Sequence, residues 1–187
     1  NKQMSNTLSN MLPLGTKAPR FELLDTVSQA YKNLEILKGH KGTLVLFICN
    51  HCPFVLHIND MLVEMANQYQ AKGIRFMAIS SNDVLNYPQD GLEFMHQQAL
   101  KFKYPFPYLY DDTQEVAKAY QAACTPDIFL FDADLRLAYR GQLDDSRPGN
   151  GIPVTGKDLK LAMDCVLNGT KVSAIQKPSI GCNIKWK

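Results

Sequence analysis

The most constraining feature of this sequence is an apolar segment that ends at two closely spaced cysteines. Residues 43–48, TLVLFI, are apolar and rich in β-branched side chains, as is typical of a buried strand. The five residues that follow are Cys49, Asn50, His51, Cys52 and Pro53. The sequence therefore predicts that both cysteines lie where a strand ends.

The spacing of the apolar residues changes after Pro53. Val55, Ile58 and Leu62 recur at intervals of three or four residues, which predicts an amphipathic helix. Pro53 suits the first helical position, because the backbone donor that proline lacks would be unpaired there in any residue. The helix therefore begins directly after Cys52, and Cys52 becomes its N-cap.

A cysteine at a helix N-cap is in a position that favours reactivity. The positive end of the helix dipole and the unpaired backbone N–H groups favour thiolate over thiol, and the thiolate is the nucleophilic form. We therefore predict that Cys52 is the reactive nucleophile. The alternative is that Cys52 is a buried cysteine that packs as a small hydrophobic side chain.

Length and charge limit the functional classes. The chain has 187 residues, which suits one domain, and a formal net charge of +2 with scattered basic residues, so neither nucleic-acid nor membrane binding is expected. No apolar segment is long enough to span a membrane, and the start, NKQMSNTLSN, lacks the layout of a secretory signal. A cytoplasmic location is therefore expected. The 5 cysteines favour reduced or transiently oxidised thiols over a fixed disulfide framework.

The other expected elements follow the order of an α/β protein. Residues 1–12 are expected to form a polar arm, residues 13–176 one domain, and residues 177–187 a cysteine-bearing tail. Within the domain we expect a hairpin about residues 21–33, strands at 74–80, 106–110, 128–131 and 136–141, and a loop at 144–155. We expect a short helix at 34–37 and longer helices at 87–102 and 157–167. Another helix is expected to begin at a cap formed by Asp112 or Thr113. This order describes an α/β sandwich with a central mixed sheet.

Several motifs in the chain resemble those of a known group. They are, in chain order, LGTKAPRF at 14–21, CNHCPFV at 49–55, SND at 81–83, YP at 87–88, CTPD at 124–127, YRG at 139–141 with DD at 144–145, and PSIGC at 178–182. Together they resemble the thioredoxin-like superfamily, and within it the redoxin branch of AhpC/TSA type that includes peroxiredoxins. The most similar group is a peroxiredoxin-like family, sometimes labelled thiol-disulfide isomerase. The resemblance implies a thioredoxin-like three-layer α/β/α sandwich and a redox site at its cysteines.

The resemblance also places individual residues. The thioredoxin nucleophile matches Cys52, but the second thioredoxin cysteine falls on Val55. Cys49 and Cys52 therefore do not occupy the two cysteine positions of the thioredoxin CxxC motif. The hydroxyl residue that precedes the peroxidatic cysteine of peroxiredoxins is Cys49 here, and the peroxiredoxin arginine is replaced by the Thr125-Pro126 region. Because a hydroxyl and a guanidinium would orient and polarise the O–O bond, the resemblance favours thiol–disulfide exchange over peroxide reduction.

The segment Thr125-Pro126 resembles the cis-proline loop of thioredoxins, which lies against the reactive cysteine. A cis bond there would present the Thr125 backbone to an extended thiol substrate. The alternative is a trans proline that starts an edge strand.

An exchange enzyme needs a second thiol that attacks the mixed disulfide on Cys52. We rank Cys49 first because it is near in sequence, Cys124 second because it precedes the proline loop, and Cys182 third because it lies on a glycine-containing tail. Cys165 lies within a predicted helix and is expected to pack in the core.

Further polar residues are candidates for the surroundings of the site. His51 and His57 could move a proton or lower a cysteine pKa, because imidazole in general titrates near neutrality, and ordinary surface or hydrogen-bonded histidines are the alternative. Asn82 follows a predicted strand at the carboxyl edge of the sheet, where function is often found in α/β proteins. Candidates for the mouth of the site, with a salt-bridged loop as the alternative, are Tyr87, Arg140, Asp144, Asp145 and Arg147. Contacts with substrate are expected from Thr125, Pro126, Pro53, His51, Asn82 and Arg140.

We predict an enzyme, a thiol–disulfide oxidoreductase in which Cys52 attacks and Cys49 or Cys124 resolves. Its expected partners are protein or small-molecule thiols and disulfides and a thioredoxin- or glutathione-type electron donor, and no cofactor is expected. A peroxiredoxin-like peroxidase that reduces hydroperoxides is the alternative. Two further classes stay open, namely a metal site formed by Cys49, His51, Cys52 and His57, and a redoxin fold that binds partners without catalysis.

Overall fold

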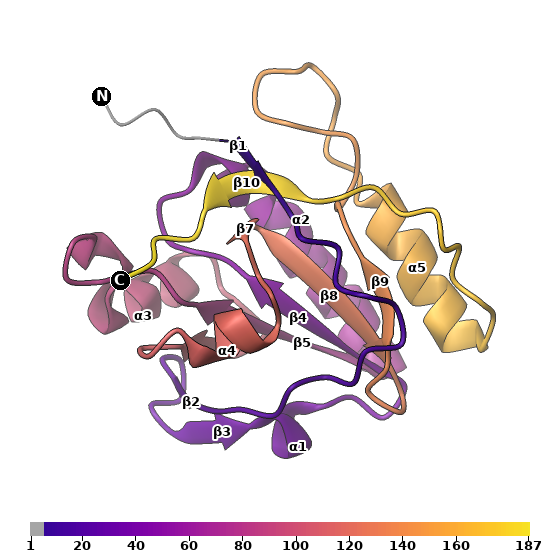
Figure 1. Ribbon diagram of the computed structural model, residues 1–187, viewed down its shortest axis with the longest axis horizontal. Helices are drawn as coiled ribbons and strands as arrows, with labels where there is room; N and C mark the ends of the chain where they lie inside the picture. The colour runs from indigo at the N-terminus through magenta and orange to yellow at the C-terminus, as the bar shows by residue number, and fades with distance from the viewer. Residues whose placement is uncertain (1–5) are drawn as a thin grey trace.

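A seven-stranded mixed sheet forms the middle of the molecule, in a computed structural model that describes residues 6–187 (Figure 1). The strands are, in spatial order, β3 (Tyr31–Asn33), β2 (Glu22–Asp25), β6 (Tyr108–Tyr110), β5 (Ile74–Ser80), β4 (Gly42–Phe47), β8 (Asp127–Asp132) and β9 (Leu137–Arg140). β4 is parallel to β5 and antiparallel to β8. The predicted mixed sheet is therefore confirmed.

β4 is the most deeply buried strand of this sheet. Neighbouring strands pair along both of its edges, and its side chains alternate between the two faces. Leu44, Leu46 and Ile48 belong to the hydrophobic cluster on one face. Val45 and Phe47 belong to the cluster on the other face. Burial on both faces explains why this segment is a continuous apolar run instead of an alternating pattern.

Helices cover both faces of the sheet. α2 (Pro53–Tyr69), α3 (Leu92–Lys101) and α5 (Lys157–Asn168) contribute to the cluster on one face. The short helices α1 (Leu34–Leu37) and α4 (Glu115–Ala119) contribute to the cluster on the other. The structure is therefore the three-layer α/β/α sandwich that the thioredoxin-like resemblance implies.

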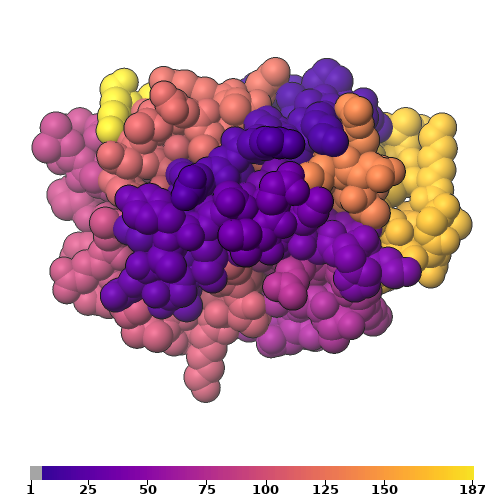
Figure 2. All heavy atoms as spheres, turned by 90° about the horizontal axis from the view of Figure 1, so that it is seen from below, coloured from indigo at the N-terminus to yellow at the C-terminus, as the bar shows by residue number. Residues whose placement is uncertain are grey.

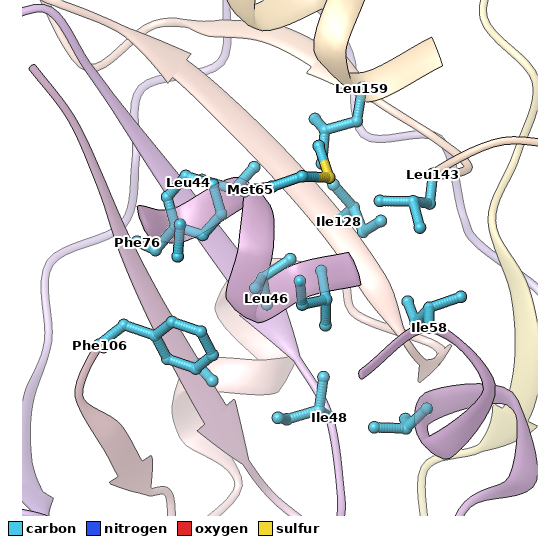
Figure 3. Close-up of a cluster of buried hydrophobic side chains, with 14 of the residues drawn as sticks. Leu44, Leu46, Ile48, Ile58, Met65, Phe76, Phe106, Ile128, Leu143 and Leu159 are labelled. Carbon is cyan, nitrogen blue, oxygen red and sulfur yellow. The ribbon is translucent and has the colours of Figure 1, made fainter. Parts of the chain in front are cut away.

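The cluster beneath α2 fixes this helix on the sheet. Figure 3 shows Met65 of α2 between Leu44 of β4 and Leu159 of α5, and all three side chains are fully buried. Burial of each side chain of this size contributes about 1.5–3 kcal/mol. The same packing that holds α2 also determines where its first turn, and hence Cys52, lies.

A second sheet of three strands lies beside the N-terminus of α2. It consists of β1 (Asn6–Leu8), β10 (Ile180–Asn183) and β7 (Cys124–Thr125), in that spatial order and with antiparallel pairing. Figure 1 shows β10, in yellow, between β1 and β7. The C-terminal tail is therefore part of the folded structure. The expected polar arm is a strand at β1, and its residues 1–5 lie outside the described part of the chain.

The helix expected at residues 87–102 is divided in two. A 3₁₀ turn at Pro88–Asp90 is followed by α3. Gly91 between them has an extended backbone, with φ −73° and ψ 172°. The expected continuous helix is therefore wrong, because the chain bends at the glycine.

The expected cap of α4 is also wrong. Neither Asp112 nor Thr113 occupies the N-cap, which is Gln114 with φ 66°. The buried carboxylate of Asp111 instead accepts a hydrogen bond from the backbone N–H of Ala117. The capping carboxylate thus comes from one residue earlier in the sequence than expected.

The N-terminal strands cover one side of the molecule. Figure 2 views the molecule from the edge where β2 and β3 lie, and the N-terminal segments, in indigo and purple, cross the middle of this face. α5, in gold, lies at its right-hand margin. Across residues 6–187, no helix has the length and apolar character needed to cross a membrane.

Leu46→Ala tests the core beneath α2. Leu46 is fully buried in β4, so we expect the cavity to lower the free energy of unfolding by about 2–5 kcal/mol. Leu85→Ala is the control, because Leu85 is 86% exposed and its truncation should change stability by less than about 0.5 kcal/mol. Urea denaturation measures both variants. Equal losses of stability would contradict the packing described.

Candidate active site

Cys52 caps the N-terminus of α2, as the sequence predicts. Pro53 is the first residue of the helix, and Cys52 has an extended backbone with φ −70° and ψ 122°. The Cys52 side chain makes no capping hydrogen bond to the helix. Its sulfur is therefore directed to other partners.

Three cysteine sulfurs gather at this point. The Cys52 sulfur lies 2.7 Å from the Cys182 sulfur on β10 and 3.2 Å from the Thr125 carbonyl oxygen on β7. The Cys49 sulfur lies 3.5 Å from the Thr125 hydroxyl oxygen. The site is therefore built from the end of β4, the start of α2, β7 and β10.

Hydrogen bonds favour the ionised form of Cys52. Cys182 has the largest effect and Cys49 also lowers the pKa, and the Thr125 hydroxyl and the Val55 backbone N–H add to them. Together they hold the pKa of Cys52 far below its usual value, although burial opposes ionisation. When Cys52 is protonated instead, its thiol donates to the Thr125 carbonyl oxygen.

The two neighbouring thiols are shifted in the opposite direction. The hydrogen bond to Cys52 raises the pKa of Cys182, and burial raises it further. The pKa of Cys49 is raised by its hydrogen bond to Cys52, by burial and by the charge of Asp90. The site therefore holds one thiolate between two protonated thiols, which is the arrangement that thiol exchange requires of a nucleophile and its partner.

Asp90 anchors the loop that carries Cys49 and Cys52. Its buried carboxylate accepts hydrogen bonds from the Asn50 backbone N–H and from the Asn82 side-chain amide, each at 3.1 Å. The sequence analysis missed Asp90, because its context indicates only the start of a helix. The sequence gives little indication of this role for Asp90, since its hydrogen bond with the Asn50 backbone N–H joins residues 40 positions apart.

The Thr125–Pro126 peptide bond is cis, as the thioredoxin-like resemblance implies. Thr125 directs its carbonyl at Cys52 and its hydroxyl at Cys49. The Pro126 carbonyl accepts a hydrogen bond of 2.6 Å from the Ser179 hydroxyl. The loop therefore contacts both the cysteines and the C-terminal tail.

Gly181 allows β10 to approach this loop closely. The neighbouring residue, Cys182, is opposite Thr125 in the register of β10 and β7. A Cβ atom on Gly181 would overlap the Thr125 carbonyl oxygen, so glycine is the residue that fits. The sequence analysis noted a glycine beside Cys182 but did not identify this contact.

The sequence analysis ranked three cysteines as partners of Cys52, and their distances from Cys52 in the structure follow a different order. Cys182, ranked third, has its sulfur in direct contact with the Cys52 sulfur. Cys49, ranked first, lowers the pKa of Cys52 as well, and its sulfur lies beside the Thr125 hydroxyl oxygen. Cys124, ranked second, directs its sulfur at the Pro126 carbonyl oxygen, at 3.5 Å. The pairing of β10 with β7, which joins distant parts of the chain, produces this difference.

Cys165 is not the core residue that the sequence analysis expects. It is half-buried on α5 and lines a cavity of about 350 Å³. The other wall of this cavity is formed by residues 171–177. The expectation is wrong because this face of α5 turns toward the tail.

His51, Pro53 and His57 surround the N-cap in the sequence but differ in their settings. His51 is exposed and Pro53 is half-buried. His57 is half-buried, with its Nε2 atom 2.7 Å from the Ser146 hydroxyl oxygen. The groups that shift the pKa of Cys52 are thiols, a hydroxyl and a backbone N–H.

Asn82 and Arg140 hold segments of the chain in place. The Asn82 side-chain oxygen accepts a hydrogen bond of 2.9 Å from the Lys185 backbone N–H, in the tail. The Arg140 guanidinium donates to the Leu12 carbonyl and to the Gln176 side chain, each at 2.8 Å. In this structure both side chains bind the protein's own termini.

The loop of residues 144–155 has a buried anchor. The Asp144 carboxylate accepts hydrogen bonds from two backbone N–H groups across the loop, and Arg147 donates to the Asp144 carbonyl. Asp145 forms salt bridges with two lysines. Tyr87 lies elsewhere, with the Lys185 ammonium 5.9 Å from its ring centroid. Asp145 therefore has the salt bridges that the sequence analysis gave as the alternative, whereas Asp144 and Arg147 line a pocket together with Phe54, His57 and Pro126.

The metal-site hypothesis finds no support in the arrangement of side chains. Over residues 6–187, no group of three or more Cys, His, Asp or Glu side chains is placed to hold a metal ion. Of the four ligands that the hypothesis requires, His51 is exposed while Cys49 and Cys52 are buried.

The fold is shared with solved structures. An uncharacterized conserved protein from Geobacillus kaustophilus is 56% identical, with a TM-score of 0.97 over 98% of this chain and 97% of that chain. A hypothetical protein from Sinorhizobium meliloti 1021 is 49% identical, with a TM-score of 0.94 over 97% of this chain and 98% of that chain. A putative thiol:disulfide interchange protein DsbE from Chlorobium tepidum is 18% identical and shares the fold, with a TM-score of 0.65 over 83% of this chain and 99% of that chain. A comparison with curated protein sequences found no match.

The fold and the clustered cysteines define a thioredoxin-like protein of the thiol redox class. The AhpC/TSA family model matches residues 14–140, and the chain belongs to this family. The resemblance noted in the sequence is therefore confirmed. The match includes Cys49, Cys52 and the proline loop, whereas β10 and Cys182 follow it in the chain.

Replacement of Cys182 tests the hydrogen bond that most favours the thiolate. We expect Cys182→Ala to raise the pKa of Cys52, because the strongest donor is lost, whereas Cys182→Ser keeps an O–H donor and should raise it less. The ultraviolet absorbance of the thiolate, followed from about pH 5 to about pH 8, measures this. The wild-type signal should stay constant, and the Cys182→Ala signal should fall as the pH falls. Identical titrations of these two proteins would contradict the assignment.

Proposed function

We propose that this protein is a thiol–disulfide oxidoreductase in which Cys52 is the nucleophile and Cys182 is the resolving thiol. The observation that carries the proposal is the 2.7 Å separation of the two sulfurs. The opposite shifts of their pKa values support it, because a nucleophile must be ionised and its partner must be held in reserve.

The first step is an attack by the Cys52 thiolate on one sulfur of an external disulfide. The bond that forms joins Cys52 to the substrate, and the bond that breaks is the substrate's own S–S bond. The second substrate sulfur leaves as a thiolate and takes a proton from solvent. The N-terminus of α2 and the Thr125 hydroxyl stabilise the Cys52 thiolate before this step.

The second step is an attack by Cys182 on the Cys52 sulfur of the mixed disulfide. Cys182 first loses its proton, which becomes easier once Cys52 no longer carries the charge that raises its pKa. A Cys52–Cys182 disulfide forms, and the substrate leaves as its second thiol. The substrate disulfide has then gained two electrons and the protein has lost two.

An external dithiol, or two molecules of a monothiol, must return these electrons. A low pKa makes a better leaving group in thiol exchange, and the Cys52 pKa is lower than that of Cys182. The donor is therefore expected to attack Cys182 and to release Cys52 as the thiolate. A thioredoxin- or glutathione-type donor in the cytoplasm, as the sequence analysis expects, suits this direction of the cycle.

The surroundings of Cys52 favour disulfide exchange over peroxide reduction. Its pKa is lowered by two thiols, a hydroxyl and a backbone N–H, and these are not the guanidinium that would polarise an O–O bond. Arg140, which the sequence analysis gives as a candidate for substrate contact, donates its hydrogen bonds to Leu12 and Gln176. Peroxide reduction therefore ranks second.

Cys52→Ser tests the proposed nucleophile. We expect the reduction of a protein disulfide by the full-length enzyme, with dithiothreitol as the electron source, to fall by at least about a hundredfold. The reason is that a serine hydroxyl is not ionised at neutral pH. Cys165→Ser is the matched control, because Cys165 lies on α5 away from the sulfur cluster, and it should keep the wild-type rate.

Two outcomes would contradict the proposal. One is a Cys52→Ser variant that reduces disulfides as fast as the wild type. The other is a wild-type protein that consumes hydrogen peroxide in a Cys52-dependent reaction but does not reduce disulfides, which would instead support the peroxidase alternative.

A further inference from the structure

The reactive sulfur of Cys52 is covered by the C-terminal tail. Cys52 is 4% exposed and Cys182 is 5% exposed. Thiol exchange requires direct access of the attacked sulfur to the nucleophile, and the position next to the Cys52 sulfur is taken by the Cys182 sulfur. An external disulfide therefore cannot reach Cys52 while β10 stays in place.

β10 is bound to β7 in the way that an extended peptide binds to the edge of a sheet. Its residues run antiparallel to β7, with Cys182 opposite Thr125. Gly181 approaches the Thr125 carbonyl so closely that no side chain would fit. Peptides that add a strand to a sheet gain affinity from main-chain hydrogen bonds and specificity from the space available to their side chains. β10 has both features and places its own cysteine on Cys52.

β10 pairs along one edge with β1 and along the other with β7, and further hydrogen bonds hold the residues at its two ends. Before the strand, the Ser179 hydroxyl donates to the Pro126 carbonyl and the Ser179 N–H donates to the Ser9 hydroxyl. After it, the Lys185 N–H donates to Asn82. The small sheet has strands of only 3, 4 and 2 residues, a size that is marginally stable without further packing. Residues 170–179, between α5 and β10, contain neither helix nor strand and form a tether.

We infer that β10 is a built-in occupant of the exchange site, which leaves β7 when a substrate strand binds and then returns. This inference rests on the proposed function. The substrate is an extended polypeptide segment that carries a disulfide-bonded cysteine. The residue before that cysteine is small, because the corresponding position, Gly181, has no space for a side chain.

The return of β10 completes the exchange in two ways. While the substrate is joined to Cys52, the thiolate of Cys182 attacks the Cys52 sulfur, the bond to the substrate breaks, and the substrate leaves as a thiol. At the same time β10 recovers its hydrogen bonds with β7. The substrate therefore loses its covalent bond and its strand pairing together, which favours release of the product.

The test uses the size dependence of Cys52 labelling in the reduced, full-length protein. N-ethylmaleimide is the small reagent, and a maleimide attached to a long polyethylene glycol chain is the bulky one. Mass spectrometry of the peptide that contains Cys52 gives both rates. Their ratio, bulky over small, removes the intrinsic reactivity of the sulfur, because both reagents react by the same chemistry.

Gly181→Ala should raise this ratio by at least about tenfold, because the added methyl group overlaps the Thr125 carbonyl and separates β10 from β7. Cys182→Ser should leave the ratio near the wild-type value, since the strand stays in place without its sulfur. Ile175→Ala is the matched control in the tether, where Ile175 is 92% exposed, and it should also match the wild type.

Equal ratios in the wild type and in a folded Gly181→Ala variant would overturn the inference. If Gly181→Ala does not fold by circular dichroism, Ser179→Ala takes its place. That variant loses the hydrogen bond to Pro126, so a smaller rise is expected, and an unchanged ratio would overturn the inference. Labelling uses no disulfide substrate, so a protein that shows gated labelling but no exchange activity would contradict the proposed function alone.

Discussion

The hydrogen bonds that two protonated thiols give to the Cys52 sulfur are the interaction on which this site depends. A buried thiolate is unfavourable unless donors surround it, and Cys52 is 4% exposed. Cys182 and Cys49 supply the donors, together with the Thr125 hydroxyl. The same contacts that ionise Cys52 also keep the other two cysteines protonated. Reactivity is thus assigned to one of three adjacent sulfurs by their environment, although all three are the same type of side chain.

Three independent parts of the fold bring these groups together. The hydrophobic cluster under α2 fixes the helix and its N-cap on the sheet. Asp90 holds the preceding loop through the Asn50 backbone N–H. The short sheet of β1, β10 and β7 delivers Cys182. The first part is a long helix packed on the central sheet, whereas the third consists of strands of 3, 4 and 2 residues that follow a segment without helix or strand. The proposed opening of the site for a substrate depends on movement of this third part.

The sequence predicts well those features that depend on local patterns. The apolar run and the proline after Cys52 predict a strand and a helix with Cys52 at its N-cap, and both elements are present. The resemblance to thioredoxins implies a cis bond before Pro126, which is present too. The contact of Cys182 with Cys52 could not be predicted from a local pattern. It joins residues 130 positions apart, and it depends on a pairing of short strands that leaves no periodic signal in the sequence.

Disulfide mapping of the full-length protein after mild oxidation tests the central claim most directly. With a limiting amount of oxidant, Cys52 should react first because it is the thiolate, and the nearest sulfur should close the bond. The account predicts that mass spectrometry will find a Cys52–Cys182 disulfide, with Cys49 and Cys124 still reduced. A disulfide between Cys49 and Cys52, with Cys182 left as a thiol, would contradict it.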